Sequence, residues 1–287
     1  MSSFAIALTG IGILLALLAV RVPVAVAMIT VGIGGYVSLN GWMPLFSYAK
    51  TSVYHAFSNY DLSVVPMFLL MSQFASKAGL SRALFEAANT FLGHRRGGVA
   101  MAAVGGCAGF GAICGSSLAT AATMAQVALP ELKRYKYSGA LATGALAAGG
   151  TLGILIPPSV VLVIFAIAVE ANIVTMFQAA LIPGLLAALG YVIAISIYVR
   201  VRPEAGPVGR RAGRSERLRA LVETWPVLLI FAIVIGGIYA GVFHPTEGAA
   251  FGAFGTAVIA FWRGGLRLDG FIDCVKGAAV STGMIFM

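Results

Sequence analysis

Two interrupted apolar segments decide the fold: GGVAMAAVGGCAGFGAICGSSLATAATMAQVALP (Gly97–Pro130) and SGALATGALAAGGTLGILIPPSVVLVIFAIAV (Ser138–Val169). The first is broken by Gly115-Ser116-Ser117, and the second by the stretch that ends in Pro157-Pro158. A broken helix leaves backbone N–H and C=O groups unpaired, which lipid tolerates only where the break is buried or lines a cavity. Two such breaks close together in sequence predict the binding site of a membrane transporter.

The composition is that of a polytopic membrane protein. Hydrophobic residues make up 60% of the 287 residues and charged residues 10%, with a mean hydropathy of +0.96. A soluble domain carries about 25% charged residues. The net charge of +9 comes from Lys and Arg in short loops between apolar runs, so it indicates membrane orientation rather than nucleic-acid binding. Cys107, Cys114 and Cys274 lack the spacing of metal ligands.

Span lengths and charges together predict a topology. The candidate spans are Phe4–Val20, Val24–Leu39, Leu62–Ala78, Tyr137–Glu170 (broken), Val174–Val199, Trp225–Val242 and Glu247–Trp262. The arms of the 98–129 segment, about 17 and 12 residues, are too short to cross a ~30 Å core comfortably, which favours a re-entrant hairpin. With the N-terminus outside, this hairpin puts 17 of the 19 Lys and Arg inside. We expect interfacial helices at Gly41–Asp61 and Ser81–Phe91.

The chain is expected to contain an inverted repeat. Val20-Arg21-Val22-Pro23 with its following span can be laid over Val242-Phe243-His244-Pro245, and the predicted topology places the two turns on opposite faces. We expect a first repeat at 1–202, a plain basic cytoplasmic linker at 203–224 and the start of a second repeat at 225–287. The second repeat would then be incomplete, as in a fragment or truncated protein. The predicted fold is therefore an all-α, ion-transporter-like membrane protein.

The two breaks supply the candidate binding groups. Ser116 and Ser117 stand where a second helix begins, so unpaired N–H groups and the positive helix end favour an anion there. Pro157 and Pro158 free carbonyls around Gly153–Leu155, which suit Na⁺ together with hydroxyl groups. The alternative is a Pro-kinked helix packed on a seam of small residues. The candidate substrate- and ion-binding residues are Gly115, Ser116, Ser117, Thr120, Thr151, Gly153, Ile154, Leu155, Pro157, Pro158 and Ser159, with Na⁺ at Ser116, Ser117 and Gly153.

These motifs resemble a known family. Gly115–Ala121, Pro130, Tyr137 and Gly153–Ser159, with further motifs at Pro66–Phe68, Arg96–Gly98, Pro183–Leu185 and Gly241–Glu247, are similar to the large membrane (M, or DctM-type) subunit of TRAP transporters. The resemblance implies a multi-pass protein of the bacterial inner membrane that imports an organic acid anion with Na⁺ by an elevator-like movement. It also implies a small four-helix membrane subunit and a periplasmic binding protein as partners. In this likeness Ser116, Ser117 and the 153–158 break belong to the first sodium site and the substrate wall.

The sequence leaves three alternative functions. A stand-alone sodium–dicarboxylate carrier would work without a binding protein. An intramembrane enzyme is disfavoured because no His, Asp or Glu lies near Ser116 or Ser117 in the sequence to act as a base. A non-transporting structural subunit is the third alternative. The sequence predicts no cofactor besides Na⁺ as the coupling ion, and it does not name the organic acid.

Overall fold

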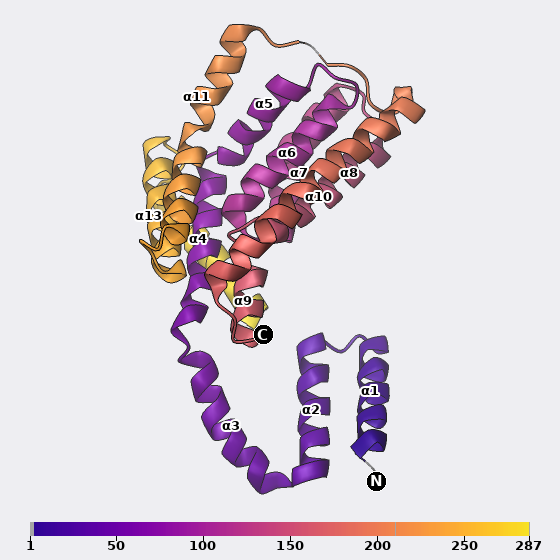
Figure 1. Ribbon diagram of the computed structural model, residues 1–287, viewed down its shortest axis with the longest axis vertical. Helices are drawn as coiled ribbons and strands as arrows, with labels where there is room; N and C mark the ends of the chain where they lie inside the picture. Colours follow the sequence, from indigo (N-terminus) through magenta and orange to yellow (C-terminus); the bar gives the residue numbers. More distant parts are fainter. Residues whose placement is uncertain (1–2, 210, 287) are drawn as a thin grey trace. The chain divides into compact units, whose positions relative to one another are not determined.

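The computed structural model describes residues 3–209 and 211–286, whose regular secondary structure is helical, without a strand (Figure 1). The all-α expectation is therefore confirmed for the described ranges. The elements are α1 Ser3–Ala19, α2 Val24–Asn40, α3 Trp42–Phe57, η1 Tyr60–Ser63, α4 Val64–Lys77, α5 Leu80–Leu92, α6 Gly98–Cys114, α7 Ser117–Arg134, α8 Gly139–Leu155, α9 Val160–Ala168, α10 Ile173–Val201, η2 Pro203–Ala205, α11 Arg214–Phe231, the π-helical turn η3 Ala232–Gly236, α12 Gly237–Tyr239, α13 Pro245–Trp262 and α14 Leu268–Phe286.

The chain divides into two compact units, 1–60 with 286–287 and 61–285. In the first unit, α1 and α2 pack on each other and are joined by a turn in which Arg21 has a φ of +66°. Gly41, with a φ of +83°, turns the chain from α2 into α3. Helix α3 carries stacked aromatic rings, with Trp42 and Phe46 at a centroid distance of 6.0 Å. It coincides with the expected interfacial helix at 41–61, whose place at the membrane surface stays a prediction.

Helix α6 forms the centre of the second unit. It packs against α4, α5, α7, α8 and α10, and most of its side chains are buried. A helix that is apolar on all sides belongs in an interior, and its small residues let neighbouring backbones approach closely. A Cβ added to Gly111 would lie only 2.7 Å from the Gly153 Cα atom, so this glycine brings α6 directly onto α8.

The second arm of the hairpin is longer than expected. The sequence indicated an arm of about 12 residues that Pro130 closes, but α7 has 18 residues and continues through Pro130 to Arg134. Pro130 deprives only the Gln126 carbonyl of its donor, while its fixed φ suits a helix. The last turn is supported by the fully buried Leu132 and by an ion pair of 3.5 Å between Glu131 and Arg134. The two arms therefore have similar lengths.

The segment expected to be a plain solvated linker is partly built into the helical unit. Gly97 N–H donates to the Gly206 carbonyl at 3.0 Å, and Tyr137 Oη accepts from Val99 N–H at 3.2 Å and donates to the Pro207 carbonyl at 3.0 Å. These bonds tie the start of α6 and the residues after α7 to the 206–207 segment, at the end of the hairpin away from its tip. Helix α11 begins at Arg214, so much of the 203–224 segment is helical rather than loop.

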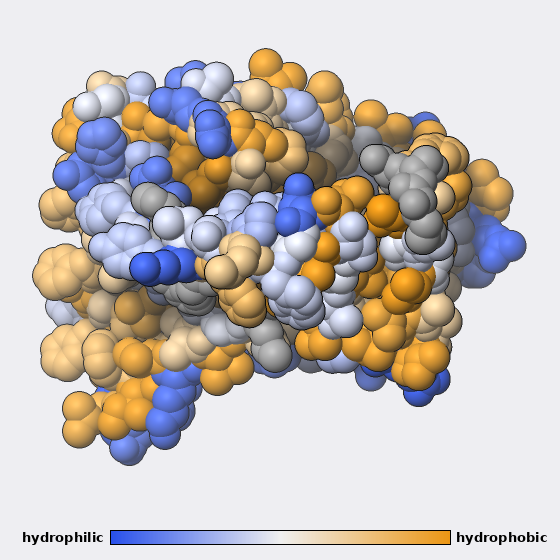
Figure 2. Space-filling model, turned by 90° about the horizontal axis from the view of Figure 1, so that it is seen from below, coloured by the Kyte–Doolittle hydropathy of each residue, from blue (hydrophilic) through white to orange (hydrophobic). Residues whose placement is uncertain are grey.

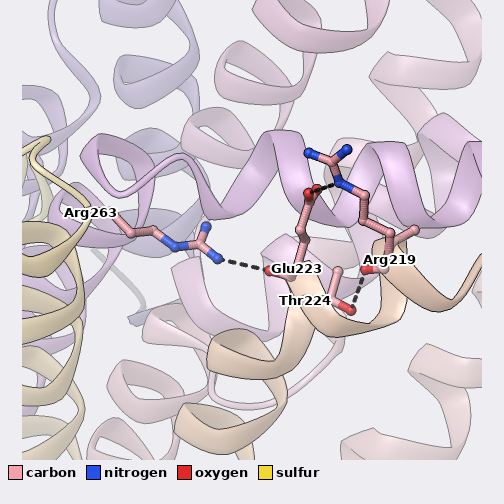
Figure 3. Close-up of polar contacts among 5 residues, drawn as sticks. Arg219, Glu223, Thr224 and Arg263 are labelled. Carbon is pink, nitrogen blue, oxygen red and sulfur yellow. Dashed lines mark hydrogen bonds and ion pairs between the residues drawn. The ribbon is translucent and has the colours of Figure 1, made fainter. Parts of the chain in front are cut away.

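Polar contacts at one end of the second unit tie α11 to α13 and α4 to α14. Figure 3 shows Arg263, which follows α13, donating to the Glu223 carbonyl at 2.9 Å, while the Glu223 carboxylate pairs with Arg219 at 2.9 Å. Lys77 of α4 and Asp273 of α14 lie 3.7 Å apart. Exposed ion pairs contribute only about 0–1 kcal/mol each, so these contacts orient helices that apolar packing holds.

Many large apolar side chains are exposed, and Figure 2 shows apolar areas beside more polar ones on one face. Ile173–Val201 and Arg214–Tyr239 are long and apolar enough to cross a membrane, and the bent pair α8–α9 makes a third possible span. Shorter apolar helices cover Phe4–Ala19, Val24–Asn40 and Gly98–Cys114. Such a surface fits a polytopic membrane protein, because lipid rather than water must face it.

Candidate substrate and cation site

The first break is a tight turn between two helices. Gly115 ends α6 with a φ of +64°, a conformation that favours glycine. Ser116 is extended and caps α7, with its Oγ accepting from Ala119 N–H at 3.5 Å. The remaining N–H groups of the first turn belong to a helix end that carries about half a positive charge.

The second break repeats this arrangement in the middle of a bent helix. Helix α8 ends at Leu155, and α9 begins at Val160 at an angle of 45°. Ser159 is fully buried and caps α9, with its Oγ accepting from Leu162 N–H at 3.3 Å. Pro157 and Pro158 have no N–H to donate to the carbonyls of Gly153 and Ile154, so these two oxygens are free of the usual helical partners.

The two breaks touch each other. Val160 N–H, in the first turn of α9, donates to the Gly115 carbonyl at 3.1 Å. A Cβ added to Gly115 would lie 2.9 Å from the Pro158 carbonyl oxygen, so no larger residue fits without a shift. The amino ends of α7 and α9 therefore meet at one place in the second unit. Such a pair of helix ends is an arrangement that attracts an anionic group.

Thr120 adds a buried polar atom to this place. The residue is fully buried, and its Oγ1 has no hydrogen-bonding partner of good geometry among the described residues. The hydroxyl faces Gly153, because a Cβ there would lie 2.6 Å from Thr120 Oγ1. It also lies beside the Cys114 thiol, a weak donor and acceptor, whose Sγ is 2.8 Å from the Ser72 hydroxyl of α4. A buried hydroxyl without a partner is costly and calls for an explanation, such as a bound ion.

Comparison with known proteins identifies the family. The family described as "Tripartite ATP-independent periplasmic transporter, DctM component" matches residues 11–287. The chain belongs to this family. The large permease protein DctM of a C4-dicarboxylate TRAP transporter from Pseudomonas aeruginosa is 40% identical over 204 residues, which cover 71% of this chain and 47% of the relative.

Other relatives of this DctM component differ in what their names say they carry. The corresponding Vibrio cholerae C4-dicarboxylate permease is 36% identical over 244 residues, 84% of this chain and 52% of the relative. The sialic acid permease SiaM of Vibrio cholerae is 30% identical over 276 residues, 94% of this chain and 63% of the relative. The chain spans about half the length of the first two relatives. These relatives are TRAP transporter permeases, so the chain is a transporter component and not an enzyme.

Most of the predicted site residues of this TRAP permease component lie where the two breaks meet. Gly153 lies against Thr120 and Ser116 there, and Gly115 lies against Pro158 and Ser159. The other members at the same breaks are Ser117, Ile154, Leu155 and Pro157. Ser117 is half-buried in the first turn of α7, and Ile154 and Leu155 are half-buried at the end of α8.

Thr151 lies apart from the other candidate binding residues. Its hydroxyl donates to the Ala148 carbonyl at 2.7 Å and lies 3.0 Å from Tyr191 Oη of α10. It thus faces α10 rather than the hairpin tip. Helix α10 forms a further wall of the second break, because a Cβ on Gly184 would lie 3.0 Å from the Leu155 carbonyl oxygen. The sequence did not predict this contact with α10, although the glycine of Pro183-Gly184 in an apolar span permits such close packing.

The donor set of the TRAP component suits a hard monovalent cation. Neither break contains Asp, Glu, Lys or Arg, and no group of three or more His, Cys, Asp and Glu side chains gathers in the part of the chain that is described. The available ligands are hydroxyl and carbonyl oxygens, including Thr120 Oγ1 and the Gly153 and Ile154 carbonyls. Uncharged oxygen ligands of this kind fit Na⁺ in transporters with unwound helices.

Proposed function

We propose that this chain carries the first half of the transport site of a Na⁺-coupled TRAP transporter that imports an organic acid anion. The observation that carries the proposal is the meeting of two serine-capped helix ends beside Thr120, a fully buried threonine. Its hydroxyl lies beside the Cys114 thiol and has no hydrogen-bond partner of good geometry among the described residues. In this arrangement the helix ends of α7 and α9 bind a carboxylate, while hydroxyl and carbonyl oxygens bind the cation.

The anion interacts with N–H groups rather than with a cationic side chain. The turns at Ser116 and Ser159 each begin a helix, and each helix end favours a negative group by about 0.3–1 kcal/mol or more when partly buried. Ser117 is half-buried and next to the first turn, where its hydroxyl can reach a ligand. Backbone N–H groups suit a carboxylate group. The rest of the substrate anion is then recognised by other parts of the transporter.

Na⁺ adjoins this anion in the proposed site. Ser116, Ser117, Thr120 and the carbonyls of the Gly153–Leu155 turn supply its oxygen ligands. The positive ion and the carboxylate stabilise each other, since their attraction at about 4 Å is worth roughly 4 kcal/mol near a protein surface. This mutual stabilisation explains the coupling: neither solute binds well without the other.

Movement of the site is proposed to be elevator-like. Helices α6, α7 and α8 pack extensively on one another, and the two breaks are joined by a hydrogen bond, so 98–168 can move as one body. The hairpin then enters and leaves the membrane on one side. Tyr137, just after α7, bonds to Val99 at the start of α6 and to Pro207. Rigid-body displacement of a repeat carrying a central site is a common route to alternating access.

The family and the distribution of Lys and Arg support a proposed cellular setting. We place the protein in the bacterial inner membrane as a multi-pass permease with a periplasmic N-terminus and with most Lys and Arg in the cytoplasm. Its proposed partners are a small four-helix membrane subunit and a periplasmic binding protein that delivers the anion. The name of the Pseudomonas aeruginosa relative, which specifies a C4-dicarboxylate, makes dicarboxylates the first substrates to test.

The test is uptake of labelled succinate, and of other organic acids, by proteoliposomes that hold the full-length permease and its small subunit. The proposal expects uptake only with an inward Na⁺ gradient and with added binding protein. Uptake without the binding protein would favour a stand-alone carrier, and uptake that ignores the Na⁺ gradient would refute sodium coupling.

A further inference from the structure

A cluster of arginines lies outside the transport site, where the start of α6 meets the last turns of α10. Arg95, Arg96 and Arg200 line a cavity of about 310 Å³ together with Met101, Val192, Ile193, Ser196 and Val199. All three arginines are exposed. Within the described ranges, none of their guanidinium groups has an ion-pair or hydrogen-bond partner. The cavity thus combines three unpaired positive charges with an apolar floor.

The helix end beside the arginines is already satisfied. Gly97 N–H donates to the Gly206 carbonyl, and Val99 N–H donates to Tyr137 Oη. An anion in this cavity therefore binds to side chains rather than to the amino end of α6. Guanidinium groups match phosphate oxygens with paired N–H donors, which makes arginine the preferred residue for such ligands.

An apolar stripe along α10 leads into the same cavity. Ile182, Leu186, Leu189 and Ile193 follow one another at intervals of four, three and four residues, and each is about half exposed or more. This spacing places them on one face of the helix, which Arg200 continues seven residues after Ile193. Helix α10 therefore presents an apolar stripe that ends at the positively charged Arg200.

We infer that this surface binds an anionic phospholipid, with its headgroup phosphate between Arg95, Arg96 and Arg200 and an acyl chain along the α10 stripe. The charges complement the phosphate, and the stripe complements the acyl chain of the same molecule. Basic pockets between membrane helices bind anionic headgroups in this manner. The bound lipid anchors α10 beside the amino end of α6.

The test compares lipid binding by the purified full-length permease with its small subunit, using native mass spectrometry. The probes are phosphatidylglycerol, phosphatidylcholine and inorganic phosphate. Since one arginine near a phosphate is worth about a fivefold change in affinity, Arg95→Gln/Arg96→Gln/Arg200→Gln should weaken phosphatidylglycerol binding roughly hundredfold. The control Arg211→Gln/Arg214→Gln/Arg267→Gln removes the same charge from exposed positions elsewhere and should change binding little.

Several outcomes would overturn the inference. Equal loss in both triple variants would mean a general charge effect, and unchanged binding in the first would exclude the cavity. Failure of the wild type to prefer phosphatidylglycerol to phosphatidylcholine would assign the arginines to another partner, and strong displacement by inorganic phosphate would make the site one for free phosphate. If the first triple variant does not fold, Arg200→Gln alone should still weaken binding about fivefold.

Discussion

Substitution of Gly153 by alanine tests how closely the two breaks must fit. A Cβ at this position would lie 2.6 Å from Thr120 Oγ1 and 2.8 Å from the Ser116 carbonyl oxygen, whereas ordinary contacts begin at 3.4 Å. The shortfall is 0.8 Å against a side chain and 0.6 Å against backbone (3.4 − 2.6 and 3.4 − 2.8). Because the Ser116 carbonyl cannot rotate away, the hairpin tip has to move.

The expected cost is that of overpacking, about 1–3 kcal/mol. The clash acts on the folded protein, which relieves it by moving the hairpin tip away from Gly153. Bringing the proposed Na⁺ ligands back together then costs up to the same amount, about 1–3 kcal/mol. The Na⁺ concentration for half-maximal uptake should then rise by about 5- to 150-fold, since 1.4 kcal/mol corresponds to a factor of ten. Thermal unfolding of the Gly153→Ala variant should also begin at a lower temperature.

The matched control is Gly144→Ala on the same helix. A Cβ at Gly144 meets nothing within 4 Å, so alanine there should only favour the helix, by up to about 1 kcal/mol. The assay is Na⁺-dependent uptake at varied Na⁺ by the reconstituted full-length transporter, alongside thermal unfolding. An unchanged Na⁺ dependence in Gly153→Ala, or an equal change in Gly144→Ala, would refute the reasoning.

Three further predictions concern other residues. Thr120→Val should leave thermal stability unchanged or raised, because the buried hydroxyl that it removes has no hydrogen-bond partner of good geometry among the described residues. It should also weaken the Na⁺ dependence of uptake, and lower stability with normal Na⁺ dependence would contradict the proposed role. Tyr137→Phe removes the bonds of Tyr137 Oη to Val99 N–H and to the Pro207 carbonyl, so it should destabilise the protein by about 1–3 kcal/mol in thermal unfolding and expose 205–209 to proteolysis. Equal effects of Tyr198→Phe would contradict this role of the two bonds. Partial desolvation on the exposed side of α5 raises the pKa of Glu86 above its ordinary value of 4.5, against the opposing effect of Arg82. The folded state then holds this proton more tightly, so stability should fall as pH rises from 4.5 through the folded pKa, and Glu86→Gln should flatten that part of the thermal unfolding profile.

The positions of the two helix breaks could be predicted from the sequence because both have local causes. Gly115 is needed for a left-handed turn, and Pro157 and Pro158 remove N–H donors from a helix. Serine at 116 and 159 then signals a new helix start. Each of these effects acts within one helical turn, so no tertiary information was needed to find them.

Contacts between distant segments could not be predicted in this way. Helix packing decides three such contacts: the hydrogen bond from Val160 to Gly115, the position of Thr151 against Tyr191, and the bond from Tyr137 to the 205–209 segment. The predicted length of the second hairpin arm was wrong because proline usually marks the end of a helix. In the structure, the buried packing of Leu132 supports α7 beyond Pro130. A single sequence shows the cost of proline in a helix but not the contacts that compensate for it.

The central claim is that the hairpin tip binds the coupling cation. Its most direct test is Na⁺-dependent uptake by Ser116→Ala/Ser117→Ala in the complete transporter, compared with Ser138→Ala. Ser138 caps α8 with a bond of 3.3 Å from Leu141 N–H, so its variant loses a cap but no proposed ligand. We predict loss of uptake with a weakened Na⁺ dependence in the folded double variant and normal uptake in the control. Unchanged uptake and Na⁺ dependence in the double variant would contradict the claim and reduce the turn at Gly115 to a packing feature.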